Sequence, residues 1–450
     1  MALFLLAWVL LGCARAQPAP ALETPTPSGP TPLPTLTAVP TPVPGTLFVD
    51  AAQSLGPISP LVYGTNYGPW MVVPVDLQEE VQAAGLTYLR FPGGAYGDEN
   101  PLQTYHIDQF IALARQLGAE PSISVRLRTG TPEEAAEAVR YVNVEKEYGV
   151  RYWSIGNEPT LYASAYDMEY DTERYNAEWR AFAEAMREVD PEIRFIGPDT
   201  HQFTATAESS PQDAAGRDWM REFLLANGDM IDVVSFHRYP FPAGGDDPPT
   251  IEELRANSRE WEAVIPRLRE MIRETTGRDL PIAVTEINSN WTHAVGGEAT
   301  PDSHYNAIWW ADVLGRLIRQ RVEMVAHFAL QAPRGSGWGM LSRYEVRPLY
   351  YVYRMYQQFG TDLVYASSDD PDLSIYAARR EDGALTVMVV NLAPEEKTKP
   401  LRIGNFAMTE PAELWLFDEE HPAEQMGTQS ITNGDTLTFP PQSVSLYVLK

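Results

Sequence analysis

Tyr152-Trp153-Ser154-Ile155-Gly156-Asn157-Glu158-Pro159 is a short apolar run that ends in a carboxylate. A second run of this kind is Pro281-Ile282-Ala283-Val284-Thr285-Glu286-Ile287-Asn288. Near-continuous apolar runs of this length predict buried strands of a parallel sheet. Burying an unpaired carboxylate is costly, so Glu158 and Glu286 each need a chemical reason to stand at a strand end. We therefore expect both strands to end at one pocket.

Similar runs recur from residue 61 to about residue 331. The strands that the sequence predicts are Leu61–Gly68, Thr87–Gly94, Glu120–Leu127, Tyr152–Pro159, Arg194–His201, Met230–Pro240, Pro281–Asn288 and Met324–Gln331. Amphipathic segments such as Pro132–Tyr148, Asp171–Val189, Thr250–Thr276 and Ser303–Arg321 separate them and predict helices. Eight strand–helix repeats predict a (β/α)₈ TIM barrel over residues 61–357. The alternative, an open doubly wound sheet, would need a Gly-rich phosphate turn, which Tyr63-Gly64-Thr65-Asn66 does not supply.

The pattern changes after residue 357 to short β-rich runs separated by turn residues. These runs are Leu373–Arg379, Leu385–Val390, Glu413–Phe417, Thr436–Phe439 and Ser443–Leu449. They predict a C-terminal β-sandwich over residues 358–450. Thr46–Ala51, within residues 46–60, predicts an N-terminal strand that joins this sandwich and would fix it to the barrel. A freely moving carbohydrate-binding module is the alternative.

The first 45 residues have the composition of neither domain. Residues 1–16 are an apolar signal segment that is too short to span a membrane as a mature helix. Cys13 follows Leu-Leu-Gly, which resembles a bacterial lipoprotein processing site and would carry a lipid anchor. Cleavage after Ala16 would instead give a soluble secreted protein. Residues 17–45 are rich in Pro and Thr and predict an extended spacer.

The formal net charge of −27 argues against nucleic acid and anionic polymers as partners of the general surface. It leaves open an acidic sugar held in a pocket that has its own arginines. Three arginines are expected near the barrel mouth: Arg126 and Arg128 at the end of the third predicted strand, and Arg238 near the end of the sixth. They are either readers of a uronic acid carboxylate or partners of nearby acidic residues, and the second interpretation is favoured.

Residues at the carboxyl ends of barrel strands converge on one face, where active sites of this fold lie. Glu158 ends the fourth predicted strand and Glu286 the seventh. Two facing carboxylates suit acid/base and nucleophilic work on a glycosidic bond. Two glutamates in buried salt bridges are the structural alternative.

Gly156-Asn157-Glu158-Pro159 followed by Thr285-Glu286 resembles glycoside hydrolase clan A, the retaining glycosidases built on this barrel. Segments such as Arg90-Phe91-Pro92-Gly93-Gly94 and Ser235-Phe236-His237-Arg238-Tyr239 are most similar to the α-L-arabinofuranosidase families. The opening Ile58-Ser59-Pro60 is shared with the β-xylosidase and β-glucuronidase families. The resemblance implies that Glu158 is the acid/base and Glu286 the nucleophile of a retaining enzyme that acts on an extracellular polysaccharide or oligosaccharide.

The resemblance also implies that Asn157 hydrogen-bonds the 2-hydroxyl of the sugar. A capping role is the alternative for this residue. Asn66, at the end of the first barrel strand, is a further candidate for substrate binding. Trp338 lies between glycines after the eighth strand, and its ring is expected to stack on a sugar.

His237 and Tyr239 are two residues apart, so their side chains are expected to point the same way, with the Tyr239 hydroxyl orienting Glu286. Arg90 ends the second strand and is expected to keep Glu286 ionised. Satisfied core polar groups and an ordinary ion pair are the alternatives for these residues.

Two carboxylates about 5 Å apart repel by about 3 kcal/mol at an effective dielectric near 20. We therefore expect Glu286 to be the anion and Glu158 to hold the proton at neutral pH. No cofactor and no metal are expected, because a metal-dependent barrel hydrolase would need His ligand spacings that the seven histidines do not provide. A catalytically inactive glycan-binding protein on the same barrel is the alternative from another functional class.

Overall fold

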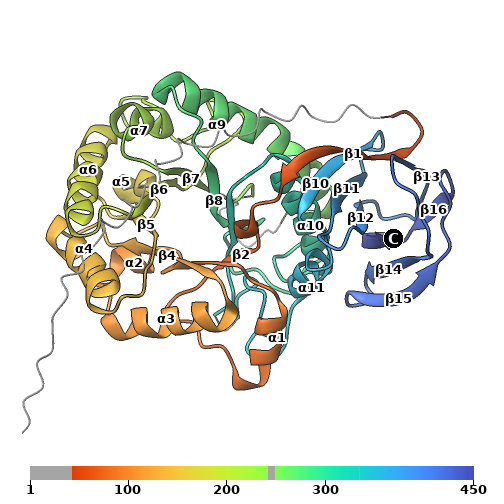
Figure 1. Ribbon diagram of the computed structural model, residues 1–450. Helices are drawn as coiled ribbons and strands as arrows, with labels where there is room; N and C mark the ends of the chain where they lie inside the picture. The colour runs from red at the N-terminus through yellow and green to blue at the C-terminus, as the bar shows by residue number, and fades with distance from the viewer. Residues whose placement is uncertain (1–42, 242–248, 334) are drawn as a thin grey trace, which may run out of the picture. The chain divides into compact units, whose positions relative to one another are not determined.

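The computed structural model describes residues 43–241, 249–333 and 335–450. The expected signal segment, the Pro/Thr-rich spacer and Cys13 lie outside the described residues. Eight parallel strands close into a barrel, and a separate sheet follows at the C-terminus (Figure 1). The predicted fold class, a TIM barrel with a C-terminal β-sandwich joined by an N-terminal strand, is confirmed. Among the described residues, no helix combines the length and the apolarity needed to cross a membrane.

The barrel strands occur in the order that the sequence predicts. They are β2 (Gly64–Asn66), β3 (Tyr88–Phe91), β4 (Glu120–Val125), β5 (Tyr152–Ile155), β6 (Arg194–Thr200), β7 (Val233–Arg238), β8 (Ile282–Ile287) and β9 (Met324–His327). Strand β2 is shorter than the expected Leu61–Gly68, because Pro60–Val62 form a 3₁₀ turn whose first amide is capped by the Ser59 hydroxyl.

Helices lie between the strands. They are α1 (Gln78–Ala83), α2 (Tyr96–Glu99), α3 (Thr104–Leu117), α4 (Pro132–Val139), α5 (Tyr162–Ala165), α6 (Thr172–Val189), α7 (Trp219–Asn227), α8 (Ile251–Asn257), α9 (Trp261–Thr276), α10 (His304–Arg319) and α11 (Pro348–Tyr356). The segment expected as one helix over Thr250–Thr276 is two helices, α8 and α9, joined by a 3₁₀ turn.

The barrel interior has an apolar floor and a polar upper layer. Tyr88, Tyr152, Ile196, Val233, Ala283, Met324 and Ala326 pack together in the floor. Inward-facing residues recur with period two along a strand. Two positions after Tyr88 comes Arg90, and two after Val233 comes Ser235. Both are almost fully buried, so charged and hydroxyl side chains fill the layer nearer the carboxyl ends of the strands.

The second sheet contains the C-terminal strands and β1, and it is hydrogen-bonded and mostly antiparallel in the order β15-β14-β17-β12-β11-β10-β1-β13-β16. They are β1 (Leu47–Pro57), β10 (Asp362–Ser368), β11 (Leu373–Arg379), β12 (Leu385–Asn391), β13 (Lys397–Gly404), β14 (Ala412–Phe417), β15 (Glu424–Gln429), β16 (Thr436–Phe439) and β17 (Ser443–Leu449). Alternate residues from both halves of the sheet, such as Val49, Val387 and Phe439, share one core. The N-terminal strand β1 pairs with β10 and β13, as predicted.

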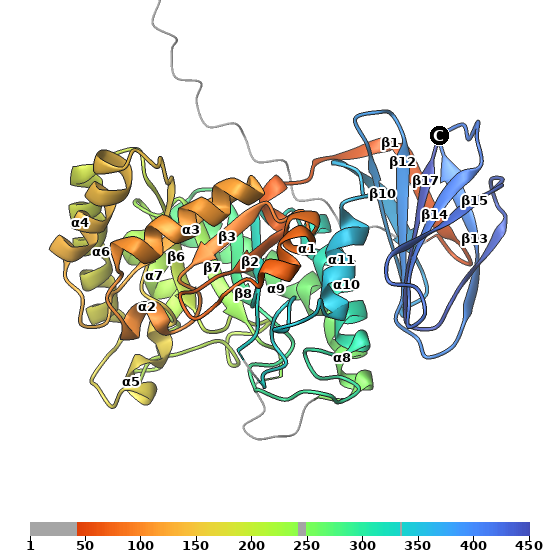
Figure 2. The same cartoon turned by 90° about the horizontal axis from the view of Figure 1, so that it is seen from below.

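The other face of this sheet packs on α10 and α11 (Figure 2). Tyr376 donates from its hydroxyl to the buried carboxylate of Asp312, which also pairs with Arg316. The Tyr305 hydroxyl donates to the carbonyl of Leu392 at 3.0 Å. Buried hydrogen bonds of this kind fasten the sheet to the barrel, which agrees with a fixed domain instead of a freely moving module.

Candidate active site

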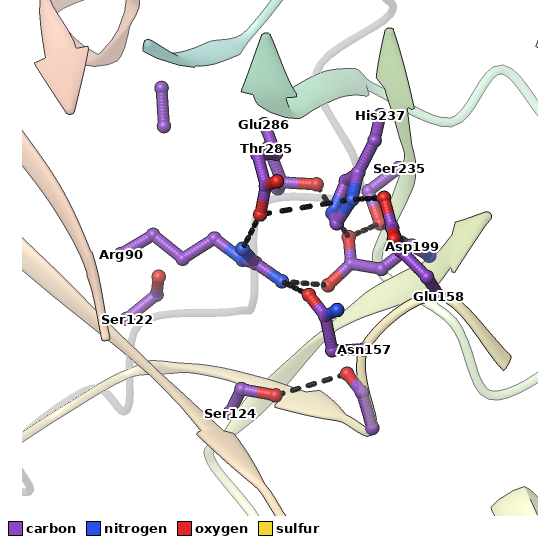
Figure 3. A network of polar contacts seen from close by, with 12 residues as sticks. Arg90, Ser122, Ser124, Asn157, Glu158, Asp199, Ser235, His237, Thr285 and Glu286 are labelled. Atoms are coloured by element: carbon purple, nitrogen blue, oxygen red, sulfur yellow. Dashed lines mark hydrogen bonds and ion pairs between the residues drawn. The ribbon is translucent and has the colours of Figure 1, made fainter. Parts of the chain in front are cut away.

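Glu158 and Glu286 meet at the carboxyl ends of β5 and β8. One ligand atom each from Glu158, His237 and Glu286 lie within 4.8 Å of one another, so a carboxylate oxygen of Glu158 comes that close to one of Glu286. Figure 3 shows both side chains directed to the same space, with His237 between them. The sequence prediction that these two carboxylates share one pocket is therefore matched by the geometry.

Local backbone features aim both glutamates at this space. Glu158 has φ 49° and ψ 53°, a left-handed conformation that turns the chain sharply after β5. Gly156 precedes it with φ +79°, and a Cβ there would lie 2.9 Å from Leu127 and from Tyr162. In β8 the register against β7 shifts between the Phe236–Val284 and His237–Glu286 pairs. Such a bulge re-aims side chains, so both Thr285 and Glu286 face the interior.

Glu286 accepts hydrogen bonds from three donors. The Arg90 Nη1 donates to its Oε2 at 3.0 Å, and the backbone N–H of Gly94 donates to the same oxygen at 3.2 Å. The Tyr239 hydroxyl donates to Oε1 at 2.6 Å. These three contacts fix the orientation of the Glu286 carboxyl group. Arg90 and Tyr239 thus lie where the sequence placed them.

Arg90 contacts several polar side chains beneath the two glutamates. Its Nη2 donates to Asn157 Oδ1 at 2.9 Å and pairs with Asp199 at 3.3 Å. Burial by itself would lower the pKa of Arg90, but the charges of Asp199 and Glu286 outweigh it and raise that pKa above its usual value. Arg90 is only 1% exposed, so it is too buried to contact a substrate. It instead fixes the positions of the two carboxylates and of Asn157 by hydrogen bonds and ion pairs.

Asn66 is expected to bind the substrate, and the structure corrects that expectation. It has no exposed surface. Its Oδ1 accepts from Arg90 at 2.9 Å, and its Nδ2 donates to the carbonyls of Thr285 and Ala326. Because both ends of the amide are used inside the barrel, Asn66 positions Arg90. The sequence predicted only that Asn66 lies at the end of a strand and gave no sign of its contact with Arg90.

Asn157 keeps one end of its amide free. Its Oδ1 is held by Arg90, and its backbone N–H donates to Asp98 at 2.7 Å. Within the described part of the chain, its Nδ2 has no protein acceptor. Asn157 is therefore fixed in orientation and presents a donor beside Glu158, as the expected contact with a sugar hydroxyl requires.

His237 connects the two glutamates. Its Nδ1 lies 2.8 Å from Glu158 Oε1 and 3.9 Å from Glu286 Oε2, and the side chain is fully buried. Burial would raise the pKa of Glu158, but the hydrogen bond and charge of His237, with smaller effects of His201 and Arg90, lower it below its ordinary value. This direction runs against the expectation that Glu158 holds the proton at neutral pH, because the contact with His237 favours the charged form of Glu158.

Sequence reasoning missed Asp199, at the end of β6. It is 1% exposed and accepts hydrogen bonds from the hydroxyls of Ser235 and Thr285. Burial would raise the pKa of Asp199, but Arg90 first and then His237 outweigh it and lower that pKa. The signal that could have found it is the one that found Glu158, a carboxylate in an otherwise apolar strand.

Asp98 was missed for a different reason, since it lies in α2 and not in a strand. One of its oxygens accepts from the backbone N–H groups of Leu127 and Arg128, at 3.0 and 3.2 Å. The other accepts from Asn157 and from the Tyr162 hydroxyl. Burial raises the pKa of Asp98 despite these hydrogen bonds. This carboxylate ties the ends of β4 and β5 together and so positions the segment that carries Glu158.

Trp338 lies in the segment that follows β9. Its ring packs against Phe328 and His293, with centroids 5.4 and 4.4 Å away. Arg347 donates to the carbonyls of Ser336, Gly337 and Trp338 and holds the segment in place. The ring is partly exposed, so the expected role in stacking on a sugar stays a prediction.

Two of the three arginines near the barrel mouth pair with acidic residues. Arg126 pairs with Glu134 at 2.9 Å, and Arg238 makes a two-pronged ion pair with Glu260. The Arg128 guanidinium instead lies 3.8 Å from the centre of the Tyr166 ring. These contacts favour partners within the protein over readers of a uronic acid.

The cluster of Glu158, His237 and Glu286 could also offer three ligands to a metal ion. However, Arg90 already supplies a positive charge at 3.0 Å from Glu286, and Nδ1 of His237 is used by Glu158. A cation at the centre of the cluster would be repelled by Arg90.

The comparisons with known proteins agree with this geometry. A model of glycosyl hydrolases family 39 matches residues 135–334, which include Glu158, His237 and Glu286. The chain is similar to the clan A glycoside hydrolases. This confirms the predicted resemblance, and the comparisons support the predicted class of enzyme, a glycosidase.

Two curated relatives have different printed activities. An intracellular exo-α-(1→5)-L-arabinofuranosidase of Streptomyces lividans is 23% identical over 42% of this chain and 33% of its own length. Endoglucanase A of Paenibacillus lautus is 24% identical over 69% of this chain and 50% of its own length. The chain thus spans a third to a half of the length of these relatives.

Solved structures share the fold over nearly the whole chain. An α-L-arabinofuranosidase of Thermotoga maritima in complex with arabinose has a TM-score of 0.70 and 20% identity, and covers 90% of this chain and 99% of its own. A xyloglucanase of Paenibacillus polymyxa has the same TM-score and coverage at 15% identity. Proteins of differing substrate thus share this architecture.

Proposed function

We propose that this protein is a retaining glycoside hydrolase in which Glu286 is the nucleophile and Glu158 the acid/base. The observation that supports this assignment most directly is the approach of the two carboxylates to within 4.8 Å at the carboxyl ends of β5 and β8. Retaining enzymes hold their carboxyl groups about 5 Å apart, whereas inverting enzymes need a wider gap for a water molecule.

In the first step, a Glu286 oxygen bonds to the anomeric carbon as the bond from that carbon to the leaving oxygen breaks. The leaving oxygen takes a proton from Glu158, whose Oε1 lies 2.8 Å from Nδ1 of His237. Arg90, Gly94 and Tyr239 stabilise Glu286 as an anion before the attack. Asn157 offers its Nδ2 to the 2-hydroxyl, where a contact strengthens in the transition state.

In the second step, water attacks the anomeric carbon and Glu286 leaves as a carboxylate. The charge of Glu286 is absent while it is esterified, so Glu158 is then free to act as a base and to take the proton of the water. With that proton, Glu158 returns to the state in which it can act as an acid. Two inversions at one carbon give net retention of configuration.

For the substrate, we propose the O-glycosidic bonds of a plant-type or other extracellular polysaccharide or oligosaccharide. The apolar first residues and the Pro/Thr-rich spacer support an action outside the cell, either as a lipoprotein anchored at Cys13 or as a secreted protein. Which sugar is cleaved is best tested with a panel of aryl glycosides and plant polysaccharides.

The test of the catalytic assignment combines stereochemistry with two variants. Proton NMR of an aryl glycoside digest should show a first product with the anomeric configuration of the substrate. Glu286→Ala should abolish turnover of every substrate. Glu158→Ala should slow poor leaving groups by about 10²–10⁴-fold and spare activated ones, with azide restoring part of the lost rate. Glu298→Ala, at an exposed position, is the matched control.

Near-wild-type activity of either variant on a glycan would contradict the proposal, and so would an inverted first product. A chain that binds glycans without hydrolysing any of the panel would instead be an inactive glycan-binding protein on the same barrel.

A further inference from the structure

A groove of about 570 Å³ lies between the segment after β2 and the segment after β9. Trp70 and Val72 line it on one side, and Gln331, Arg343 and Tyr344 on the other. Both segments follow the carboxyl ends of barrel strands, so the groove opens on the same face of the barrel as Glu158 and Glu286. None of its residues belongs to the catalytic cluster described above.

The groove carries large apolar side chains that face solvent. Tyr344 is 79% exposed and Val72 is 74% exposed. Trp70 is partly buried, with its ring 5.4 Å from that of Tyr96. Exposed apolar side chains gathered at a hollow, with a few polar groups beside them, mark binding surfaces in soluble proteins. Tyr and Trp rings suit ligands that are apolar on one face and polar at the edge.

Gln331 supplies the polar group. It is 7% exposed, and its Oε1 accepts from the backbone N–H of Val72 at 2.8 Å. Its amide nitrogen has no acceptor among the residues that the structure describes. The amide is thus held at its oxygen, and its nitrogen reaches solvent at the groove, where it can donate to a ligand.

The charges at the groove are nearly balanced. Arg343 lies with its guanidinium 5.3 Å from the centre of the Tyr344 ring, and Asp76 lines the same groove. One positive and one negative side chain favour a neutral ligand over an anion or a cation. Aromatic rings, an amide donor and low net charge together fit the hydroxyl-rich faces of a neutral sugar.

Both segments that line the groove also contact residues around the catalytic cluster. Trp70 is four residues after Asn66, which spans at most about 14 Å of chain. Tyr96, which the Trp70 ring contacts, is two residues after Gly94, the donor to Glu286. On the other side, the N–H of Leu330 donates to the carbonyl of Asn66 at 2.9 Å, directly before Gln331.

We propose that this groove is a distal subsite that binds one unit of a neutral glycan chain while a bond of the same chain is cleaved between Glu158 and Glu286. The proposal rests on the proposed glycosidase function for the place of cleavage. Trp70 and Tyr344 stack on the sugar, and Gln331 donates to one of its hydroxyls. The preferred substrate is therefore an extended oligosaccharide or polysaccharide instead of a short glycoside.

The test measures the dependence of kcat/KM on chain length. Arabino-, xylo- and cello-oligosaccharides, each from the disaccharide to the hexasaccharide, are compared with the matching aryl monoglycosides. In the wild-type protein, kcat/KM is expected to rise with length until the chain reaches the groove. Tyr344→Ala and Trp70→Ala are each expected to lower kcat/KM on the long oligosaccharides by about tenfold and to leave kcat/KM on the aryl monoglycosides unchanged. Tyr105→Ala, an aromatic that is 57% exposed on α3, is the matched control.

A direct binding measurement keeps the two proposals apart. Calorimetry of the Glu286→Ala protein with the hexasaccharides should show binding that weakens about tenfold when Tyr344→Ala or Gln331→Leu is added. The subsite proposal is wrong if kcat/KM of the wild-type protein does not rise with chain length. It is also wrong if Tyr344→Ala and Trp70→Ala show the same rise as the wild-type protein. If neither aryl glycosides nor glycans are cleaved but Tyr344-dependent binding persists, the proposed function fails and the glycan subsite stands.

Discussion

The Nδ1 of His237 lies 2.8 Å from Glu158 Oε1, and this hydrogen bond lowers the pKa of a carboxyl group whose burial would raise it. The acid/base of the proposed mechanism is thus set by a neighbour on a different strand.

Replacing His237 should change the titration of Glu158. In His237→Leu the hydrogen bond and the charge are gone and burial remains, so the pKa of Glu158 should rise above that of the wild-type protein. A raised pKa means that Glu158 stays protonated to a higher pH. Infrared difference spectra, with the Glu158 band assigned from Glu158→Gln, would measure this. His421→Leu, between β14 and β15 of the C-terminal domain, should leave the band in place, and an unshifted titration in His237→Leu would contradict the prediction.

Tyr239→Phe tests the donor to Glu286. The hydroxyl donates at 2.6 Å to a carboxylate, and hydrogen bonds to charged groups contribute about 1.5–3 kcal/mol. We expect kcat/KM to fall by roughly 10- to 100-fold while the free energy of unfolding changes little. The control is Tyr447→Phe, which removes a buried tyrosine hydroxyl from the C-terminal sheet. Equal kinetics in the two variants would show that Tyr239 does not orient the nucleophile.

Arg90→Met tests the charge balance of the barrel interior. Removing the cation leaves Asp199 and Glu286 as buried charges without their ion-pair partner, which should lower the free energy of unfolding by about 3–5 kcal/mol. Adding Asp199→Asn should recover part of this loss, because one of those charges is then gone. Activity should not return, since Glu286 still lacks its partner. Urea unfolding of both variants, with the exposed Arg402→Met as control, measures the effect. A double variant no more stable than Arg90→Met would refute the coupling.

Asp213 should make stability depend on pH in the acid range. Burial would raise its pKa, but hydrogen bonds from the backbone of Arg217 and from Thr172, with the ion pair to Arg217, lower it to about 2. A depressed carboxyl pKa stabilises the folded state above about pH 4, and this contribution is lost as the pH falls towards 2. Asp213→Asn should therefore cost about 2 kcal/mol at pH 7 and almost nothing near pH 2, as measured by urea unfolding. Glu173→Gln, an exposed partner of Arg217, should cost much less at both values.

The apolar runs of the chain are enough to predict most of the fold. Eight of them predicted the barrel strands, and the carboxylates of Glu158 and Glu286 marked the ends of two. The strands β10, β13 and β15 were missed because their patterns are weak. Strand β15, for example, is exposed along its whole length and has no buried face to give an alternating pattern.

What the sequence by itself determined is the architecture and the pair of glutamates, because burial and the period of two are local properties of a strand. Only the tertiary structure decided what surrounds them: the hydrogen bond between Glu158 and His237, the support of Arg90 by Asn66, and the buried Asp199. Those contacts join strands far apart in the chain, and they depend on the bulge before Glu286 and on the register of neighbouring strands. A shift of one residue would turn each side chain to the other face, which no local pattern records.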